Sequence, residues 1–174
     1  MDFLLFFLFW ELELIPMFFL ISIWGTGRKE YSAMKFLIFT ILGSAFMLIG
    51  ILVIFAGTGT FDMTKISEAL PSSNLIMPVG ILFLFMSIGF AVKLPVFPLH
   101  TWLPDAHTDA PTAASVMLAG VLLKMGGYGL LRVSAGMFPD QLEKYAWVLA
   151  LLGVINIIYG AAITIRQTDL KRLI

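Results

Sequence analysis

The chain contains no cysteine, only two histidines and few charged residues. Without cysteine it can form no disulfide, no thiolate metal site and no cysteine-held iron–sulfur cluster. Two histidines are too few for a haem pair, or for a zinc site unless carboxylates complete the ligand set. The formal net charge is zero, so no excess of basic residues favours nucleic acid as a partner.

What the sequence has in abundance is apolar surface. Hydrophobic residues make up 60% of the 174 residues and charged residues 13%, whereas soluble chains carry about 45–50% and about 25%. The mean hydropathy is +0.98, so lipid is the natural solvent. The N-terminus is not a signal peptide, because it lacks a basic start and carries Glu11 and Glu13 in its apolar stretch. The composition therefore predicts an all-α polytopic membrane protein.

Five segments are long and apolar enough to cross a bilayer, which takes about 20 residues of helix. We expect a single membrane domain over 1–174, with spans at residues 3–24, 36–56, 76–103, 112–133 and 145–165. Pro95 and Pro98 interrupt the third span, so we expect that helix to break near residues 93–98. The chain starts inside a span and stops in the polar turn "QTDLKRLI", which favours a fragment of a longer protein.

The lysines and arginines of the loops predict the orientation. One side carries Arg28, Lys29, Lys35, Arg166, Lys171 and Arg172, and the other carries Lys65, Arg132 and Lys144. Because the basic side faces the cytoplasm (or the stroma or matrix), we expect the 25–35 loop there and the 57–75 loop on the opposite side.

Four ionisable residues lie within or beside the expected spans: Glu11, Glu13, Lys93 and Lys124. A charge at mid-bilayer costs about 2.5–3.5 kcal/mol even on permissive insertion scales, so such residues are expected to face partners inside a bundle. Glu11 and Glu13 are two positions apart, about 200° around a helix, so at most one of them faces a given neighbour. Both can also be purely structural.

The two lysines differ in their position along the spans. Lys93 precedes the proline-interrupted segment, and broken helices are where transporters place ion sites. An interfacial lysine at a helix end is the alternative. Lys124 lies about halfway along the fourth span, where reaching water would be strained. A buried lysine near a carboxylate can exchange a proton near neutral pH. His100 and His107 flank "TWLPDA" and are either proton-relay residues or hydrogen-bonding residues that hold the broken helix.

Several long motifs resemble one known family. They are "WELELIPMFFLISIWG", "AMKFLIFT", "FAVKLPVFPLHTWLPDAHTDAPTAASVMLAGVLLKMGGYGLLR" and "GAAITIRQTDLKRLI". Together they resemble the antiporter-like membrane subunit called chain 4 (the M-type or D-type subunit) of NADH:quinone or plastoquinone oxidoreductase, the respiratory complex I family. The resemblance covers essentially the whole sequence and is most specific over 90–132. "ELEL" looks like the plastid and cyanobacterial form, and "DAHTDAPTAAS" like the general bacterial form.

The resemblance implies a fold of about fourteen helices with two inverted five-helix repeats, each containing one broken helix. This chain would be the first repeat without its opening helix, followed by the helix that begins the second repeat. The family's proton-path residues match Glu11 paired with Lys93, then Lys124, with His100 and His107 as candidate relay members.

The same resemblance implies a proton-translocating subunit with no cofactor or metal of its own. The complex as a whole would use NAD(P)H or ferredoxin, FMN or iron–sulfur clusters, and a quinone, all bound by other subunits. Its partners would be the other membrane subunits, including related antiporter-like chains, and the lipid bilayer, without nucleic acid. It would lie in a bacterial inner membrane or a thylakoid membrane. A subunit of a multisubunit cation/proton antiporter, or a structural membrane subunit without a proton path, remains an alternative.

Overall fold

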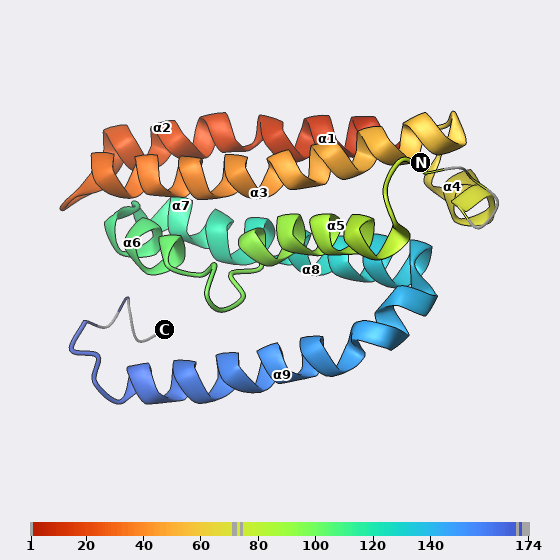
Figure 1. Cartoon of the computed structure of the whole chain (residues 1–174). Coiled ribbons are helices and arrows are strands. Elements are labelled where there is room, and N and C mark those ends of the chain that lie inside the picture. Colours follow the sequence, from red (N-terminus) through yellow and green to blue (C-terminus); the bar gives the residue numbers. More distant parts are fainter. Residues whose placement is uncertain (1, 71–72, 74, 170, 172–174) are drawn as a thin grey trace.

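The computed structural model describes residues 2–70, 73, 75–169 and 171, and within these residues it is helical apart from turns and one isolated bridge between Asp2 and Asp62 (Figure 1). The helices are α1 (Phe3–Leu12), α2 (Leu14–Trp24), α3 (Lys29–Thr58), α4 (Met63–Ala69), α5 (Val79–Lys93), α6 (Trp102–Asp109), α7 (Thr112–Met117), α8 (Leu123–Gly129) and α9 (Pro139–Thr164), with π-helical turns η2 (Leu118–Leu122) and η3 (Leu130–Ala135). The predicted all-α polytopic fold is confirmed.

Four of the described helical segments are long and apolar enough to cross a membrane: Phe3–Trp24, Lys29–Thr58, Thr112–Ala135 and Pro139–Thr164. A fifth, Val79–Lys93, is apolar but shorter. The helices cover all five expected spans in order, but α3 and α9 begin several residues before the expected 36 and 145. Where each helix enters and leaves the bilayer stays a prediction.

The first span is two short helices joined at Glu13. Asp2 starts α1 by accepting a hydrogen bond from the Leu5 N–H at 2.8 Å. Pro16 has no N–H to give to the Leu12 carbonyl, so the regular helical bonding fails where α2 begins. The result is a break beside two carboxylates in the middle of an apolar segment.

The long helix α3 packs along α2, α5 and α6 and holds these elements together (Figure 1). Glycines bring α3 and α5 close, because a Cβ at Gly89 would lie 3.0 Å from the Gly43 carbonyl oxygen. Two apolar clusters result, one around Trp10 and Phe90 and the other around Leu14 and Trp102. The α1–α2 junction passes from the first cluster to the second.

The third span is broken, as the prolines predict. Helix α5 ends at Lys93, and α6 restarts the helix only at Trp102. The Trp102 indole donates to the Val92 carbonyl oxygen at 2.9 Å, which folds the second half of the segment back onto the end of the first. The fourth span is unbroken from Thr112 to Ala135 but contains the two π-helical turns, which the sequence analysis did not predict.

Helix α9 lies apart from the bundle over much of its length and contains no buried residue (Figure 1). It contacts the bundle through η3 and α5 and through the turn that follows α5. There the Asn156 side-chain oxygen accepts a hydrogen bond from the Phe97 N–H at 2.9 Å.

A buried ion pair between two helix breaks

The centre of the candidate site is Lys93, whose side chain is only 2% exposed and which forms an ion pair with Glu13. Lys93 is the last residue of α5, and Glu13 is the residue between α1 and α2. Both charges therefore lie where a helix is interrupted. Backbone interrupted inside a membrane has to be buried against protein or a wet cavity, which suits a buried charge.

Trp10 gives the Lys93 ammonium two further partners. The Lys93 Nζ donates to the Trp10 carbonyl oxygen at 3.1 Å and lies 4.1 Å from the centroid of the Trp10 ring. Trp10 is itself 2% exposed and meets Phe90 of α5 edge to face, with ring centroids 5.6 Å apart. The lysine is thus enclosed by a carboxylate, a carbonyl and an aromatic face.

The expected pairing of Lys93 with Glu11 is wrong, because the ion-pair partner is Glu13. Glu11 instead lies near Ser44 of α3, whose hydroxyl donates to the Ile41 carbonyl oxygen at 3.0 Å. The angular separation of about 200° between the two glutamates explains why only one reaches the lysine. Among the described residues, the Glu11 Oε1 is buried and has no hydrogen-bond partner. We refer to Trp10, Glu11, Glu13 and Lys93 as the Lys93 cluster.

Lys124 lies on the exposed face of α8 and outside this cluster. Gly126, two residues further, faces α5, because a Cβ there would lie 2.7 Å from the Leu94 nitrogen. Two residues are about 200° apart on a helix, so Lys124 points away from α5. No ion pair links Lys124 to the Lys93 cluster within the described residues. Lys124 is therefore two residues from Gly126, which contacts the end of α5, and its own side chain is exposed.

A π-helical turn precedes Lys124. The Leu123 N–H bonds to the carbonyl of Leu118, five residues back, where an α-helix would use Ala119. This Ala119 carbonyl oxygen instead accepts a hydrogen bond from the Lys124 ammonium, at an Nζ–O distance of 2.7 Å. Such π turns are frequent at functional sites. Nothing in the periodicity of this apolar segment signals the extra residue in the turn, so the sequence analysis missed it.

His100 lies in the turn after α5, between two aromatic rings. Its ring centroid is 5.7 Å from that of Phe97 and 5.1 Å from that of Tyr159 on α9. Among the described residues, its Nδ1 is buried without a hydrogen-bond partner. Tyr159 and Asn156 together attach α9 to the break. Asn156 was missed in the sequence, although an amide inside an apolar span was a signal that could have been used.

His107 lies on α6, further from the break along the chain. Burial, helped by the nearby Lys171 ammonium, holds the pKa of His107 below its ordinary value. The Lys171 ammonium donates to the Ala110 carbonyl oxygen at 2.8 Å, at the C-terminal end of α6. No hydrogen bond or ion pair joins either histidine to the Lys93 cluster in the part of the chain that the structure describes.

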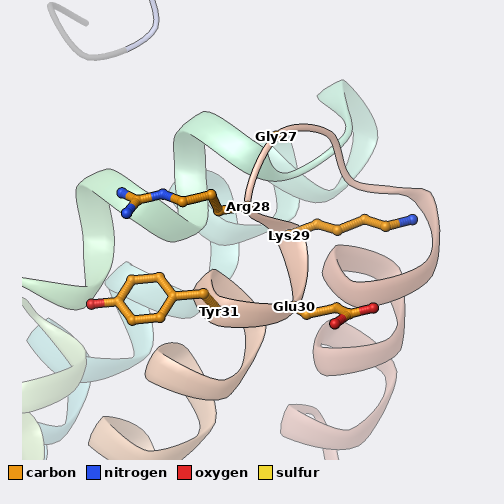
Figure 2. Close-up of a pocket in the computed structure, with 5 residues that line it drawn as sticks. All are labelled: Gly27, Arg28, Lys29, Glu30 and Tyr31. Atoms are coloured by element: carbon orange, nitrogen blue, oxygen red, sulfur yellow. The ribbon is translucent and has the colours of Figure 1, made fainter.

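A surface hollow of about 410 Å³ lies elsewhere, at the turn between α2 and α3. It is lined by five consecutive residues, Gly27, Arg28, Lys29, Glu30 and Tyr31 (Figure 2). Arg28 and Tyr31 extend to one side, with the guanidinium 5.2 Å from the ring centroid, while Lys29 and Glu30 extend to the other. It contains no member of the Lys93 cluster, so we do not regard it as the candidate site.

Comparison with known proteins decides the family. All of residues 1–174 match the family described as NADH:quinone oxidoreductase/Mrp antiporter, TM. The chain belongs to this family. It is 51% identical to NAD(P)H-quinone oxidoreductase chain 4 of Trichodesmium erythraeum, with 99% of this chain and 33% of that protein covered. It is 50% identical to NAD(P)H-quinone oxidoreductase chain 4 of Picosynechococcus sp., with 98% and 32% covered. The chain thus spans about a third of the length of these relatives.

Two solved structures share the fold of this antiporter-family chain. Respiratory complex I from Thermus thermophilus with bound NADH matches with a TM-score of 0.86 and 29% identity, over 99% of this chain and 37% of that one. The archaeal membrane-bound sulfane sulfur reductase matches with a TM-score of 0.88 and 27% identity, over 99% and 35%. The resemblance to complex I chain 4 and the multi-pass membrane location are confirmed. Since one fold serves both complexes, the fold alone does not specify the electron acceptor.

Proposed function

We propose that this chain is the proton-translocating part of a membrane subunit in a quinone-reducing complex of the complex I type. The observation that carries the proposal is the ion pair between the buried Lys93 and the half-buried Glu13, which lies between two helix breaks. Removing two charges from water costs several kcal/mol per ion, and apolar packing would hold the helices at lower cost. A role in proton translocation explains why charged residues occupy these positions in place of apolar ones.

Each charged residue then has its own role. Lys93 is the fixed cation of the path, and Glu13 is its counter-ion. Glu11 is the carboxyl group that takes up and releases the proton, because it lies beside the ion pair but is not the carboxylate held by Lys93. Lys124 passes the proton onward from the exposed face of α8, and His100 and His107 are candidate members of the same hydrated path. The family positions of Glu11, Lys93 and Lys124 support these roles.

The electron chemistry belongs to partner subunits in this proposal. The named relatives are chains of NAD(P)H-quinone oxidoreductases. We therefore expect NAD(P)H or ferredoxin, FMN or iron–sulfur clusters, and the quinone to be bound outside this chain. The partners are the other membrane subunits, including related antiporter-like chains, in a bacterial inner membrane or a thylakoid membrane.

The test removes both charges of the ion pair at once, in the full-length chain within its complex. Breaking a buried pair by one substitution costs about 3–5 kcal/mol, because it leaves an uncompensated buried charge. The double variant Lys93→Met with Glu13→Gln leaves no such charge, and the side chain at position 13 is 20% exposed, so this variant should assemble. In vesicles, it should translocate fewer protons per quinone reduced than the wild type, because the fixed charge of the path is gone. Normal translocation by an assembled double variant would reject the proposal and leave a structural role.

The second candidate function is that of a cation/proton antiporter subunit, because the matching family includes Mrp antiporters. A cation/proton antiporter subunit would move protons in response to a sodium gradient without quinone turnover. Measuring proton movement in the same vesicles, with sodium but no electron donor, separates the two functions. We favour the first, because the relatives at about 50% identity are oxidoreductase chains.

A further inference from the structure

We propose that Trp10 is a positioning residue for Lys93, and that its ring face and carbonyl hold the ammonium in place while the neighbouring Glu11 changes charge. The inference rests on the proposed proton-translocating function. It adds a neutral aromatic residue to a path that the sequence analysis described only through ionisable groups.

The first step is the geometry around the amine. The Lys93 Nζ lies 4.1 Å from the Trp10 ring centroid, well inside the range of about 6 Å over which a cation is attracted to an aromatic face. The attraction is greatest when both groups are removed from water. Lys93 and Trp10 are each 2% exposed, so this condition is met.

The second step is that Trp10 is itself fixed in orientation. Its ring meets Phe90 edge to face at 5.6 Å and an interplanar angle of 72°, and Phe6 at 5.5 Å and 47°. Phe90 lies three residues before Lys93 on α5, and residues at this spacing share a helix face. The indole is therefore packed against the same helix that carries the lysine, and it keeps its place relative to the amine.

The third step concerns what changes during proton transfer. Of the three partners of the ammonium, only the Glu13 carboxylate can lose its charge by taking up a proton. The other charged group that acts on Lys93 is Glu11. The Trp10 carbonyl and ring remain acceptors whatever the protonation state of the two glutamates. Trp10 thus keeps the ammonium at one place along the path while Glu11 takes up and releases its proton.

A second buried tryptophan separates positioning from simple packing. Trp102 is fully buried and packs on Phe36, with ring centroids 5.4 Å apart. In the described part of the chain, the cations found over aromatic rings face Trp10, Tyr31 and Tyr145, and none faces Trp102. Both tryptophans fill the interior, and Trp102 also donates its indole N–H to the Val92 carbonyl oxygen. Of the two, only Trp10 has a cation on its face, so Trp102 is the control for the ring-face effect.

The test replaces each tryptophan in turn by its mono-, di- and trifluorinated forms, in the full-length chain within its complex. Each fluorine draws electrons from the ring face and weakens cation binding, while the shape of the ring changes little. We expect protons translocated per quinone reduced to fall stepwise along the Trp10 series, by about three- to fivefold at trifluorination. The Trp102 series should change little, because fluorination keeps the indole N–H that donates to the Val92 carbonyl oxygen. As a check by ordinary substitution, Trp10→Phe should retain more translocation than Trp10→Leu.

The outcomes distinguish this inference from the function beneath it. An unchanged Trp10 series, or equal losses in the two series, would overturn the positioning role, provided that the double variant Lys93→Met with Glu13→Gln abolishes translocation. Normal translocation in that double variant would instead reject the proposed function. A stepwise loss confined to Trp10 supports both.

Discussion

At the scale of single residues, the two glutamates of the "ELEL" motif have different surroundings although they are two positions apart. Glu13 is held in the ion pair with Lys93. Glu11 faces Ser44, and among the described residues its buried Oε1 lacks a partner. A carboxylate already paired with a fixed cation is a poor proton carrier, whereas one with a free oxygen can accept a proton.

This difference leads to a prediction about the two carboxylates. Glu11→Gln should lower proton translocation by about tenfold or more, because it removes the group that exchanges the proton. Glu13→Gln should have a smaller effect, because Lys93 keeps its two contacts with Trp10. Translocation per quinone reduced, measured on assembled complexes in vesicles, compares them. A larger loss for Glu13→Gln would exchange the two roles.

A second prediction at this scale concerns Lys124. If it relays protons, it must release its proton, which arginine does not do at ordinary pH. Lys124→Met and Lys124→Arg should then both assemble and translocate about a tenth of the wild-type protons or fewer. A lysine that only holds helices together predicts the reverse order, with arginine tolerated and methionine destabilising. Subunit incorporation and proton uptake, measured for both variants, show whether Lys124 transfers protons or only holds helices together.

At the scale of elements, the sequence predicted the break in the third span but not what holds it. Pro95 and Pro98 remove backbone donors, so an interruption near Lys93 followed from the sequence alone. The attachment of the interrupted turn to α9 depends on Asn156, 59 residues after Phe97. Neither helical periodicity nor composition predicts such a distant contact.

The contact itself is testable. Asn156→Leu keeps a similar volume but leaves the Phe97 N–H without its acceptor, which costs about 1–3 kcal/mol when the group is buried. We expect a lower midpoint of thermal unfolding for the assembled complex in detergent. The neighbouring Ile157→Leu is the control, because Ile157 is 73% exposed. Equal midpoints for the two variants would show that the hydrogen bond does not stabilise the turn.

In the candidate site, too, the features visible in the local sequence were predicted and the contacts between distant segments were not. Lys93, Lys124, Glu11 and Glu13 were found because a charge in an apolar span is visible in the sequence. The sequence did not show that Lys93 pairs with Glu13 and not with Glu11, because this pairing depends on the orientation of α1 and α2 against α3 and α5. The role of Trp10 was also missed, because a tryptophan in an apolar span usually signals packing.

At the scale of the whole molecule, two faces lack partners within the described residues. Helix α9 has no buried residue, and Lys124 is exposed halfway along its segment. An ammonium facing lipid at mid-bilayer would cost about 2.5–3.5 kcal/mol or more. We therefore expect the Lys124 face to meet protein or a water-filled cavity in the assembled complex.

The orientation of the molecule can be tested at the two ends of α3. This helix has 30 residues, so it is about 45 Å long and its ends lie on opposite sides of a hydrocarbon core of about 30 Å. The α2–α3 turn is at one end and α4 at the other (Figure 1). Lys35 and Lys171 lie with α6 near the first end, and Lys65 lies on α4. Arg172, which contributes to the predicted bias, is outside the described residues.

Single cysteines can serve as labels, because residues 1–174 contain no cysteine, and labelling of this subunit is compared with that of the unsubstituted complex. Glu30 and Glu68 are exposed at the two ends, whereas Ser32 is buried and donates to the Asp109 side chain at 2.5 Å. In sealed vesicles containing the complex, we expect Glu30→Cys to react with an impermeant reagent only from the cytoplasmic side. Glu68→Cys should react only from the opposite side, because the more basic side stays in the cytoplasm. Labelling of Glu68→Cys from the cytoplasmic side would show that the orientation is the reverse of the predicted one.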